Sequence, residues 1–313
     1  MRLEHDNPLH KNVITINWCM GNICNFSCSY CPASLKDGSI AWYNYNDVIS
    51  FCDKIIEHYQ NKTVYFEFTG GEISLWKEFP KLCEYLKSKN TKVGFLSNGS
   101  PSLEWWESIA NHCDHVCLSY HAEHGDEVHF IKVVKLTSKH FRTHVNIMMI
   151  PEKFNQLYDI ASKIIKIKNI SIALQPLIKD FQTEMYEYSA LQKHLLNNQH
   201  DLLSKNIIYD KDYESYRGSM VLIDNDNNRK TLSAQQLVST KQNSWFDWKC
   251  SAGIEQIIIH TDGTIQRGWC NVGGKIGHIL DKNLKLPTDC VICDKQYCSS
   301  IFDIMSSKEQ INE

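Results

Sequence analysis

The stretch "CNFSCSYCPASL" (residues 24–35) places Cys24, Cys28 and Cys31 within a single short segment. It follows the apolar run "VITINW" (13–18), which predicts a strand. Four thiolates close a structural metal site, whereas a catalytic metal site keeps one coordination position open. Three cysteines in a loop after a strand therefore predict a metal centre with one open position.

Apolar runs alternate with amphipathic segments over the first two-thirds of the chain. Strands are predicted at 13–18, 63–71, 91–99, 115–121, 141–150 and 169–177. Helices are predicted at 45–59 (with Asn46 as N-cap), 75–89, 102–111, 126–140, 153–167 and 186–200. Strand–helix units at this spacing imply parallel strands with helical crossovers. The fold class is therefore α/β, a partial (β/α)6 TIM-like barrel with a small C-terminal cysteine-rich β-hairpin domain; an open flavodoxin-like sheet is the alternative.

The alternation breaks near residue 200, which predicts a division into domains. Residues 1–200 are expected to form the barrel, 201–249 a connector that contains the loop "DNDNN" (224–228), and 250–313 the small domain. A hairpin is predicted at 254–270, with Asp262-Gly263 at its turn.

Composition limits the function classes. The 313 residues are 42% hydrophobic, which is ample for a large core. The net charge of −3 gives no basic excess, so nucleic acid is an unlikely partner. No apolar run approaches 18 residues and the first residues, "MRLEHDNPLH", are polar. We expect no membrane span and a cytoplasmic location.

The cysteines are clustered rather than evenly spread. Of 13 cysteines, three lie at 24–31 and five lie at 250, 270, 290, 293 and 298. In a reducing compartment such clusters predict metal ligands rather than disulfides. The remaining five occur singly in apolar or helical contexts and are predicted to be small core residues; they are Cys19, Cys52, Cys83, Cys113 and Cys117.

Cys24-x3-Cys28-x2-Cys31, with the aromatic Tyr30 before the last cysteine, resembles the signature of radical S-adenosylmethionine (radical SAM) enzymes. The resemblance implies a partial (β/α)6 barrel and a [4Fe–4S] cluster held by three thiolates. Its open iron would bind the amino and carboxylate groups of S-adenosylmethionine (SAM). The reduced cluster would cleave SAM to methionine and a 5′-deoxyadenosyl radical, which abstracts hydrogen from a substrate. An electron donor such as flavodoxin or ferredoxin is implied as a partner.

Further residues match the family's cofactor-binding pattern. "TGGE" (69–72) ends the second predicted strand, where the family carries a GGE-type motif that receives the SAM amino group. Gly70 and Gly71 allow a close backbone approach, and Glu72 has the charge to neutralise an ammonium. The resemblance also implies SAM contacts from Tyr30 and from polar residues that end the next strands, namely Ser97, Asn98 and Ser119; turn chemistry and packing are the alternatives.

Polar residues share one face of the predicted strands. Alternation along each strand places Asn17, Glu67, Ser119, His121, His144, Asn146 and Gln175 inside the barrel. Buried polar groups require partners, so a polar ligand is expected there; a self-satisfied network is the alternative. His121, His144 and Glu67 are the candidate catalytic residues. His121 and Glu123, in "HAEHGDEVH" (121–129), are expected at the mouth as substrate contacts.

The late cysteines predict a second metal centre. Cys290-x2-Cys293 can bind one metal unit from a single turn, while Cys250 and Cys270 bracket the hairpin. This region resembles the twitch or SPASM extension of radical SAM enzymes, which implies a second [4Fe–4S] cluster. Cys298 is a fifth candidate ligand, and zinc is the competing metal.

The sequence does not decide the class of the second substrate. The polar interior suits a sugar, nucleotide sugar or amino acid, with epimerisation or dehydrogenation as the type of chemistry. A peptide, as in radical SAM enzymes that mature ribosomally synthesised peptides (RiPP maturases), is the alternative. A non-catalytic metal-binding module is the alternative from another class.

Overall fold

The computed structural model describes residues 1–179, 184–199, 220–232, 234–298 and 300–311. The chain divides into two compact units. Unit 1 contains residues 1–20, 43–67 and 214–313, and unit 2 contains residues 21–42 and 68–213. Each unit is described by itself below.

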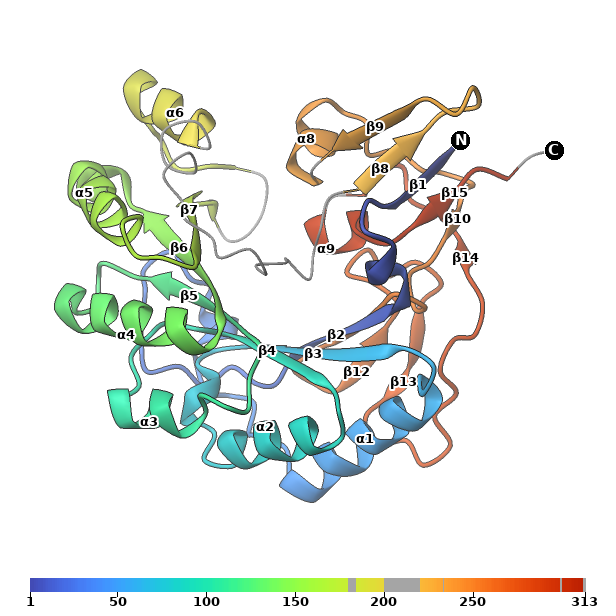
Figure 1. The fold of residues 1–313 in the computed structure, drawn as a ribbon, viewed down its shortest axis with the longest axis horizontal. Helices are drawn as coiled ribbons and strands as arrows, with labels where there is room; N and C mark the ends of the chain where they lie inside the picture. The colour runs from blue at the N-terminus through green and yellow to red at the C-terminus, as the bar shows by residue number, and fades with distance from the viewer. Residues whose placement is uncertain (180–183, 200–219, 233, 299, 312–313) are drawn as a thin grey trace. The chain divides into compact units, whose positions relative to one another are not determined.

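Unit 2 is built on a parallel sheet with the strand order β4-β5-β6-β7 (Figure 1). The strands are β4 (Lys92–Ser97), β5 (His115–Tyr120), β6 (Arg142–Met149) and β7 (Ile170–Pro176). The helices are α2 (Phe79–Ser88), α3 (Leu103–Ser108), α4 (Glu127–His140), α5 (Phe154–Ile164) and α6 (Ala190–Asn197), with 3-10 turns η2 (Ala33–Leu35), η3 (Ile73–Leu75) and η4 (Pro151–Lys153). In Figure 1, α3, α4 and α5 follow one another along the same side of this sheet.

The two faces of this sheet differ in polarity. On one face, Val116, Leu118, Val145 and Ile147 are fully buried. Residues between them in the sequence point to the opposite face; Ser119, His144, Asn146 and Gln175 are half-buried there. The predicted alternation of apolar and polar faces is therefore confirmed for these strands.

Unit 1 contains a second run of paired strands. The strands are β2 (Val13–Cys19), β3 (Thr63–Thr69, of which the residues to Glu67 belong to this unit), β11 (Gln256–Ile259), β12 (Thr264–Gln266) and β13 (Lys275–His278). β11 pairs parallel to β2 and antiparallel to β12, so the predicted hairpin at 254–270 is present. Its turn includes Gly263, whose φ of +79° favours glycine.

Helix α1 (Tyr45–His58) lies between β2 and β3 in the sequence of unit 1. One face of this helix is buried, and it consists of Val48, Phe51, Cys52 and Ile55. The prediction of Asn46 as N-cap is wrong by two residues, because the Asn44 side chain accepts the hydrogen bond from the Asn46 N–H.

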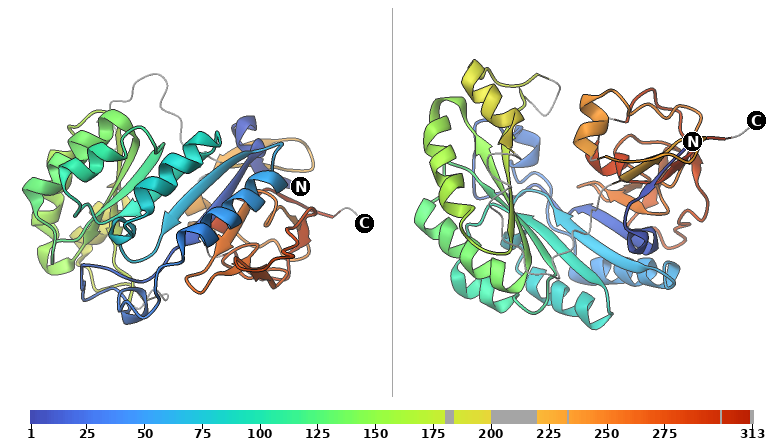
Figure 2. Two further views of the ribbon diagram at one scale, coloured as in Figure 1. Left: turned by 90° about the horizontal axis from the view of Figure 1, so that it is seen from below. Right: turned by 45° about the horizontal axis from the view of Figure 1, so that its top comes forward.

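A six-stranded sheet with the order β14-β10-β15-β1-β8-β9 completes unit 1 (Figure 2). Its strands are β1 (Arg2–His5), β8 (Met220–Ile223), β9 (Arg229–Leu232), β10 (Lys249–Cys250), β14 (Val291–Ile292) and β15 (Lys308–Glu309). The remaining elements are η1 (Pro8–Asn12), α8 (Ala234–Ser239) and α9 (Ile301–Ile304). Arg2 pairs with Glu309 and with Ile223, so both ends of the chain meet in this sheet.

The prediction of an α/β fold is confirmed, and all six predicted parallel strands exist with shifts of at most two residues at their ends. Among the described residues, neither unit forms a closed barrel. The predicted division at residues 200 and 249 stays a prediction, and residues 201–219 of the connector lie outside the described residues. The compact units divide the chain elsewhere, because β1, β8 and β9 share one sheet with the cysteine-bearing strand β10.

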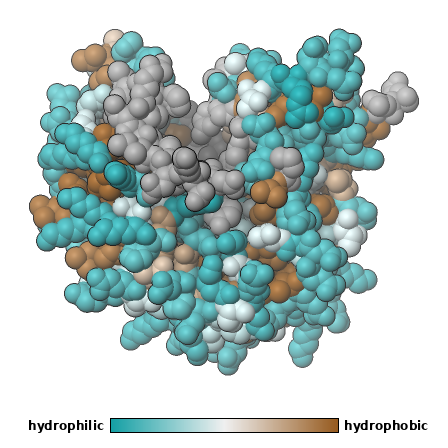
Figure 3. Space-filling view, viewed as in Figure 1, coloured by the Kyte–Doolittle hydropathy of each residue, from teal (hydrophilic) through white to brown (hydrophobic). Residues whose placement is uncertain are grey.

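The surface is polar with scattered apolar side chains (Figure 3). Leu9, Val128 and Tyr297 are about two-thirds exposed and lie in separate elements or loops. Single exposed apolar residues of this kind are ordinary on protein surfaces. In the part of the chain that the structure describes, every helix is too short or too polar to cross a membrane.

Candidate active site

The cysteine loop (residues 24–31) lies in unit 2, ahead of η2. Cys28 is buried, and Cys24 and Cys31 are half-buried. Burial raises the pKa of Cys28 to about 11, and the charges of Cys24 and Cys31 act in the same direction. The three thiols are therefore close enough to influence one another, and a bound metal would be needed to keep all three deprotonated at neutral pH.

Lys36 supplies positive charge to this loop. Its Nζ donates a hydrogen bond to the carbonyl oxygen of Cys28. Burial raises the pKa of Cys31 and of Cys24, and the charge of Lys36 acts to lower both. A cation at this position favours thiolates over thiols, as a metal site requires.

The GGE segment (Gly70–Glu72) packs on the backbone that leads into the cysteine loop. The Gly71 N–H donates to the Gly21 carbonyl (3.0 Å), and the Glu72 N–H donates to the Ile23 carbonyl (2.8 Å). A Cβ on Gly71 would lie 2.2 Å from the Ile23 oxygen, and a Cβ on Gly70 would lie 2.4 Å from the Gly21 oxygen. Both positions therefore require glycine because the GGE segment packs tightly on the backbone of residues 21–23. The sequence alone did not reveal this reason.

Glu72 is fully buried, and its carboxylate is hydrogen-bonded within the protein. Its Oε1 accepts hydrogen bonds from Ser74 N–H (3.2 Å), Ser74 Oγ (2.6 Å) and Ser97 Oγ (3.0 Å), and its Oε2 accepts one from Asn98 N–H (2.7 Å). Burial raises its pKa, whereas these hydrogen bonds act to lower it. Glu72 therefore joins the GGE segment to the end of β4; its predicted contact with an ammonium stays a prediction.

Asn98 extends this network to the cysteine loop. Its Nδ2 donates to the Asn25 Oδ1 at 2.8 Å. The structure thus brings Ser97, Asn98 and Glu72 together next to Asn25 of the cysteine loop, and their contacts with SAM stay predictions. Ser119 is half-buried on the polar face of β5, and its SAM contact remains a prediction.

The β5–α4 loop (residues 121–126) contacts the cysteine loop through His121 and Glu123. His121 Nδ1 lies 2.9 Å from the Tyr30 hydroxyl and 3.5 Å from Cys28 Sγ. Glu123 accepts hydrogen bonds from Ser29 N–H (2.6 Å) and Ser29 Oγ (2.5 Å). His121 and Glu123, predicted to face a substrate, therefore contact the cysteine loop in this structure.

Two features of the β5–α4 loop bear on its chemistry. Burial lowers the pKa of His121 to about 4, so its imidazole is neutral at pH 7. Cys28 Sγ, a Glu123 oxygen and a His124 nitrogen all lie within 4.8 Å of one another, a spacing suited to a metal ion. The sequence analysis identified the acids and histidines of this loop but not their contact with the cysteines, because that contact depends on two loop conformations.

The polar face of the unit 2 sheet carries a hydrogen-bonded row across three strands. His144 Nδ1 lies 2.7 Å from Ser171 Oγ, and His144 Nε2 lies 3.1 Å from Asn146 Oδ1. Asn146 Nδ2 donates to Cys117 Sγ at 3.2 Å. Cys117, predicted to be a packing residue, is part of this row. The row places His144 among fixed partners while leaving it half-buried.

Glu67, the third predicted catalytic residue, belongs to unit 1. It is 4% exposed near the end of β3. Its predicted role is not tested by this geometry.

The late cysteines all lie in unit 1. Cys250 and Cys293 are buried in one apolar cluster with Ala252 and Val272, and Cys270 packs against it. Cys298 is also buried, whereas Cys290 is exposed, with its Sγ 3.7 Å from Ser251 Oγ.

Asp303 organises the backbone around Cys270. The carboxylate of Asp303 accepts hydrogen bonds from Trp269 N–H (2.9 Å), Cys270 N–H (2.7 Å) and Gln256 Nε2 (2.7 Å). It is 2% exposed. A residue that fixes the backbone of a predicted ligand resembles the outer-shell support found around metal sites.

The sequence model of the Radical SAM superfamily matches residues 18–164. This range includes the cysteine loop, the GGE segment and the β5–α4 loop. Residues 18–164 form a radical SAM domain. The match confirms the prediction of an enzyme, and no curated protein matches the chain significantly.

Solved structures share the fold of the radical SAM domain and its surroundings. SuiB of Streptococcus suis bound to S-adenosylmethionine is 14% identical, with a TM-score of 0.54 over 86% of this chain and 64% of that chain. SuiB bound to its precursor peptide SuiA is 12% identical, with a TM-score of 0.55 over 86% and 63%. anSMEcpe with bound AdoMet is 15% identical, with a TM-score of 0.55 over 87% and 79%. The chain thus spans less than two-thirds of SuiB, and these likenesses concern the fold.

The residues of the radical SAM domain fit the cofactors that it implies. Cys24, Cys28 and Cys31 form a set of three soft donors in one loop, the ligand type that holds iron–sulfur clusters. The charge of Lys36 favours the thiolate forms of Cys24 and Cys31 against the effect of burial. The GGE segment fixes the backbone that leads into the cysteine loop.

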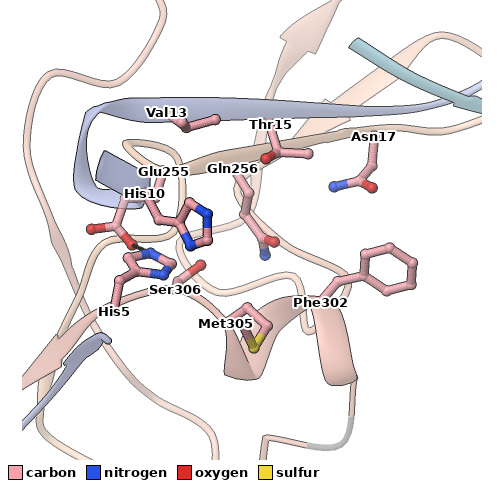
Figure 4. Close-up of a pocket in the computed structure, with 10 residues that line it drawn as sticks. All are labelled: His5, His10, Val13, Thr15, Asn17, Glu255, Gln256, Phe302, Met305 and Ser306. Carbon is pink, nitrogen blue, oxygen red and sulfur yellow. Dashed lines mark hydrogen bonds and ion pairs between the residues drawn. The ribbon is translucent and has the colours of Figure 1, made fainter. Parts of the chain in front are cut away.

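A separate small pocket lies in unit 1 (Figure 4). Its volume is about 40 Å³, room for two or three ordered waters at roughly 10–15 Å³ each. His5 Nε2 lies 3.1 Å from Glu255 Oε2 at one end, and Asn17 lines the other end. Asn17, predicted to contact a ligand, therefore has a polar cavity beside it, although a pocket of this size suits water equally well.

Proposed function

We propose that the chain is a radical SAM enzyme in which Cys24, Cys28 and Cys31 hold a [4Fe–4S] cluster whose fourth iron takes SAM. When bound and reduced, the cluster supplies the electron that cleaves SAM to methionine and a 5′-deoxyadenosyl radical, which abstracts hydrogen from a second substrate. The observation that carries this proposal is that two backbone hydrogen bonds join the GGE segment to Gly21 and Ile23, which lead directly into the three-cysteine loop.

Residues around the cysteine loop would position the cluster ligands and bind SAM. The GGE segment fixes the start of the cysteine loop, and Glu72 holds the ends of β3 and β4 together. Ser97, Asn98, Ser119 and Tyr30 are the proposed SAM contacts. Flavodoxin or ferredoxin is the proposed class of electron donor.

The polar face of the unit 2 sheet supports a polar second substrate. His144, Asn146 and Gln175 are half-buried on that face, and a polar ligand would complete their hydrogen bonding. We favour a sugar, nucleotide sugar or amino acid, with epimerisation or dehydrogenation as the outcome. His144 and Glu67 remain the proposed catalytic groups. A peptide is the second candidate, because the structure of SuiB with its precursor peptide is among the matched folds.

We also propose a second metal centre on the late cysteines. The burial of Cys250 and Cys293 in one apolar cluster supports it, as do the packing of the half-buried Cys270 against that cluster and the fixed backbone at Cys270. A [4Fe–4S] cluster of the twitch type is the favoured occupant, with Cys290 and Cys298 as further candidate ligands and zinc as the alternative metal.

The test is SAM cleavage by anaerobically reconstituted protein. After reduction, the protein should release 5′-deoxyadenosine from SAM, and Cys28→Ala should fall to the background of the protein-free reaction. Cys28→Ala should also lose only the iron of the cysteine loop and keep that of the late cysteines. Cys19→Ala, which removes a nearby cysteine outside the loop, is the matched control and should retain activity.

Two results would contradict the proposal. One is intact wild-type protein, with its full iron and sulfide content, that leaves SAM uncleaved. The other is protein that takes up zinc and no iron, which would favour a non-catalytic metal-binding module.

A further inference from the structure

Tyr30 and His121 form a hydrogen-bonded chain that ends at Cys28. His121 Nδ1 lies 2.9 Å from the Tyr30 hydroxyl, and the two rings are nearly parallel, at 11° with centroids 6.0 Å apart. The Tyr30 hydroxyl also lies near enough to the Cys28 side chain to interact with it. Cys28 Sγ is itself 3.5 Å from His121 Nδ1.

The direction of these hydrogen bonds follows once Cys28 ligates a metal. A ligating sulfur is a thiolate, which has no proton and can only accept. Two donors stand near this sulfur, the N–H on His121 Nδ1 at 3.5 Å and the Tyr30 O–H, and of these we assign the Tyr30 O–H as the donor to Cys28 Sγ. Its oxygen keeps lone pairs, so it accepts from the N–H on His121 Nδ1, and both dipoles point toward the sulfur.

The contact is held in place from several directions. Glu123, two residues beyond His121, accepts hydrogen bonds from both the N–H and the hydroxyl of Ser29, the residue between Cys28 and Tyr30. Phe26 lies edge-on to His121 at a centroid distance of 6.1 Å. Tyr30 is 7% exposed. The hydroxyl is therefore fixed near the sulfur and shielded from water that could replace it.

On the basis of the proposed function, we propose that Tyr30 and His121 tune the reduction potential of the cluster held by the cysteine loop, with Tyr30 donating to Cys28 Sγ and His121 positioning Tyr30. Reduction adds one negative charge to the cluster. A donor aimed at a ligating sulfur stabilises that added charge, and hydrogen bonds to the sulfurs are among the known determinants of cluster potential.

This assignment gives His121 a positioning role, where the sequence suggested a catalytic one. Its Nδ1 is directed at Tyr30 and Cys28 in the described structure. Tyr30 acquires a contact with the cluster ligand through its hydroxyl, in addition to the SAM contact expected of its ring.

The test is the midpoint potential of the reconstituted protein, measured by redox titration with electron paramagnetic resonance and without SAM. The spectrum of Cys28→Ala is subtracted to remove the contribution of the late cysteines. Tyr30→Phe, which removes only the hydroxyl, should shift the midpoint to a more negative potential. Tyr120→Phe is the matched control, because the Tyr120 hydroxyl donates to the Gly125 carbonyl in the adjacent loop (3.3 Å) and not to sulfur. It should leave the midpoint unchanged.

A pair of changes at His121 tests the positioning role separately. His121→Ala should shift the midpoint in the same direction as Tyr30→Phe. His121→Asn, whose amide N–H can replace the Nδ1 donor, should restore it. If Tyr30→Phe fails to retain its cluster, the midpoint potentials of His121→Ala and His121→Asn still test the tuning role.

The outcomes separate this inference from the proposed function. A wild-type protein without a redox-active cluster at the cysteine loop would end both. A wild-type protein that cleaves SAM, with the same midpoint in Tyr30→Phe as in wild type at equal iron content, would overturn only the tuning role. Equal shifts in Tyr30→Phe and Tyr120→Phe would overturn it as well, since a general loosening of the loop would then explain both.

Discussion

Among the glycines of unit 2, Gly71 has the least room for a side chain, because an added Cβ would lie 2.2 Å from the Ile23 carbonyl oxygen. Its missing side chain allows the GGE segment to lie directly against Ile23, and Glu72 then reaches Ser97 and Asn98. Sequence reasoning identified all these residues but assigned their purpose to the cofactor. Contacts between two non-adjacent loops have no local sequence pattern, which is why this second purpose was not predicted.

Gly71→Ala should destabilise the protein. A Cβ at 2.2 Å from a carbonyl oxygen forces the backbone to shift, at a cost of about 3 kcal/mol in the free energy of unfolding. Gly38→Ala is the control, because its nearest neighbour is 3.8 Å away and only its φ of +69° adds a cost of about 1 kcal/mol. Urea unfolding measures both; equal losses in the two variants would refute the close contact.

At the scale of elements, strands and helices of unit 2 follow the hydrophobic pattern closely. Predicted strands such as 115–121 and 141–150 match β5 and β6 because apolar and polar residues alternate along them. The cap of α4 is equally local. Asp126 ends the β5–α4 loop, and its side chain accepts the hydrogen bond from His129 N–H at 2.7 Å. The helix start and the loop that contacts the cysteines are thus joined at one residue.

Asp126→Ala should lower the free energy of unfolding by about 1 kcal/mol, because the first turn of α4 loses its acceptor. Asp126→Asn keeps an acceptor oxygen and should stay close to the parent. The urea midpoint of each variant checks this. Equal urea midpoints for the alanine and asparagine variants would show that the Asp126 cap does not contribute to stability.

At the scale of the whole molecule, prediction failed for the six-stranded sheet of unit 1. Its strands β10, β14 and β15 have two residues each, too few to show alternation, and its partners are far apart in the sequence, such as Leu3 and Lys308. Residues 220–232 lie in the predicted connector, for which some structure was expected without any strand being assigned, and they form the hairpin β8–β9 around the "DNDNN" loop. Short strands with remote partners carry almost no signal in sequence.

Glu255 gives unit 1 a pH dependence. It accepts hydrogen bonds from His5 Nε2 (3.1 Å) in β1 and from Ser307 N–H (2.7 Å) just before β15. Burial raises its pKa, but His5 and Ser307 outweigh burial and leave the pKa below its usual value of 4.5. A carboxylate with a lowered folded-state pKa contributes stability above its unfolded-state pKa and loses that contribution as the pH falls through the folded-state value.

The free energy of unfolding should therefore lose the Glu255 contribution only below about pH 4.5. Glu255→Gln should be less stable than the parent at neutral pH, and the difference should shrink as the pH is lowered through this range. Urea unfolding at a series of pH values measures it. A difference that stays constant down to strongly acidic pH would contradict the assignment.

The position of β1 between β15 and β8 has a consequence for biosynthesis. Its first partner strand in translation order, β8, begins at Met220, so β1 must wait on the ribosome until that residue has been translated. Residues 68–213 emerge in the meantime and contain all of the parallel strands β4 to β7. A nascent chain stalled before residue 220 should accordingly protect amides in β4 to β7 while leaving those of β1 open to exchange.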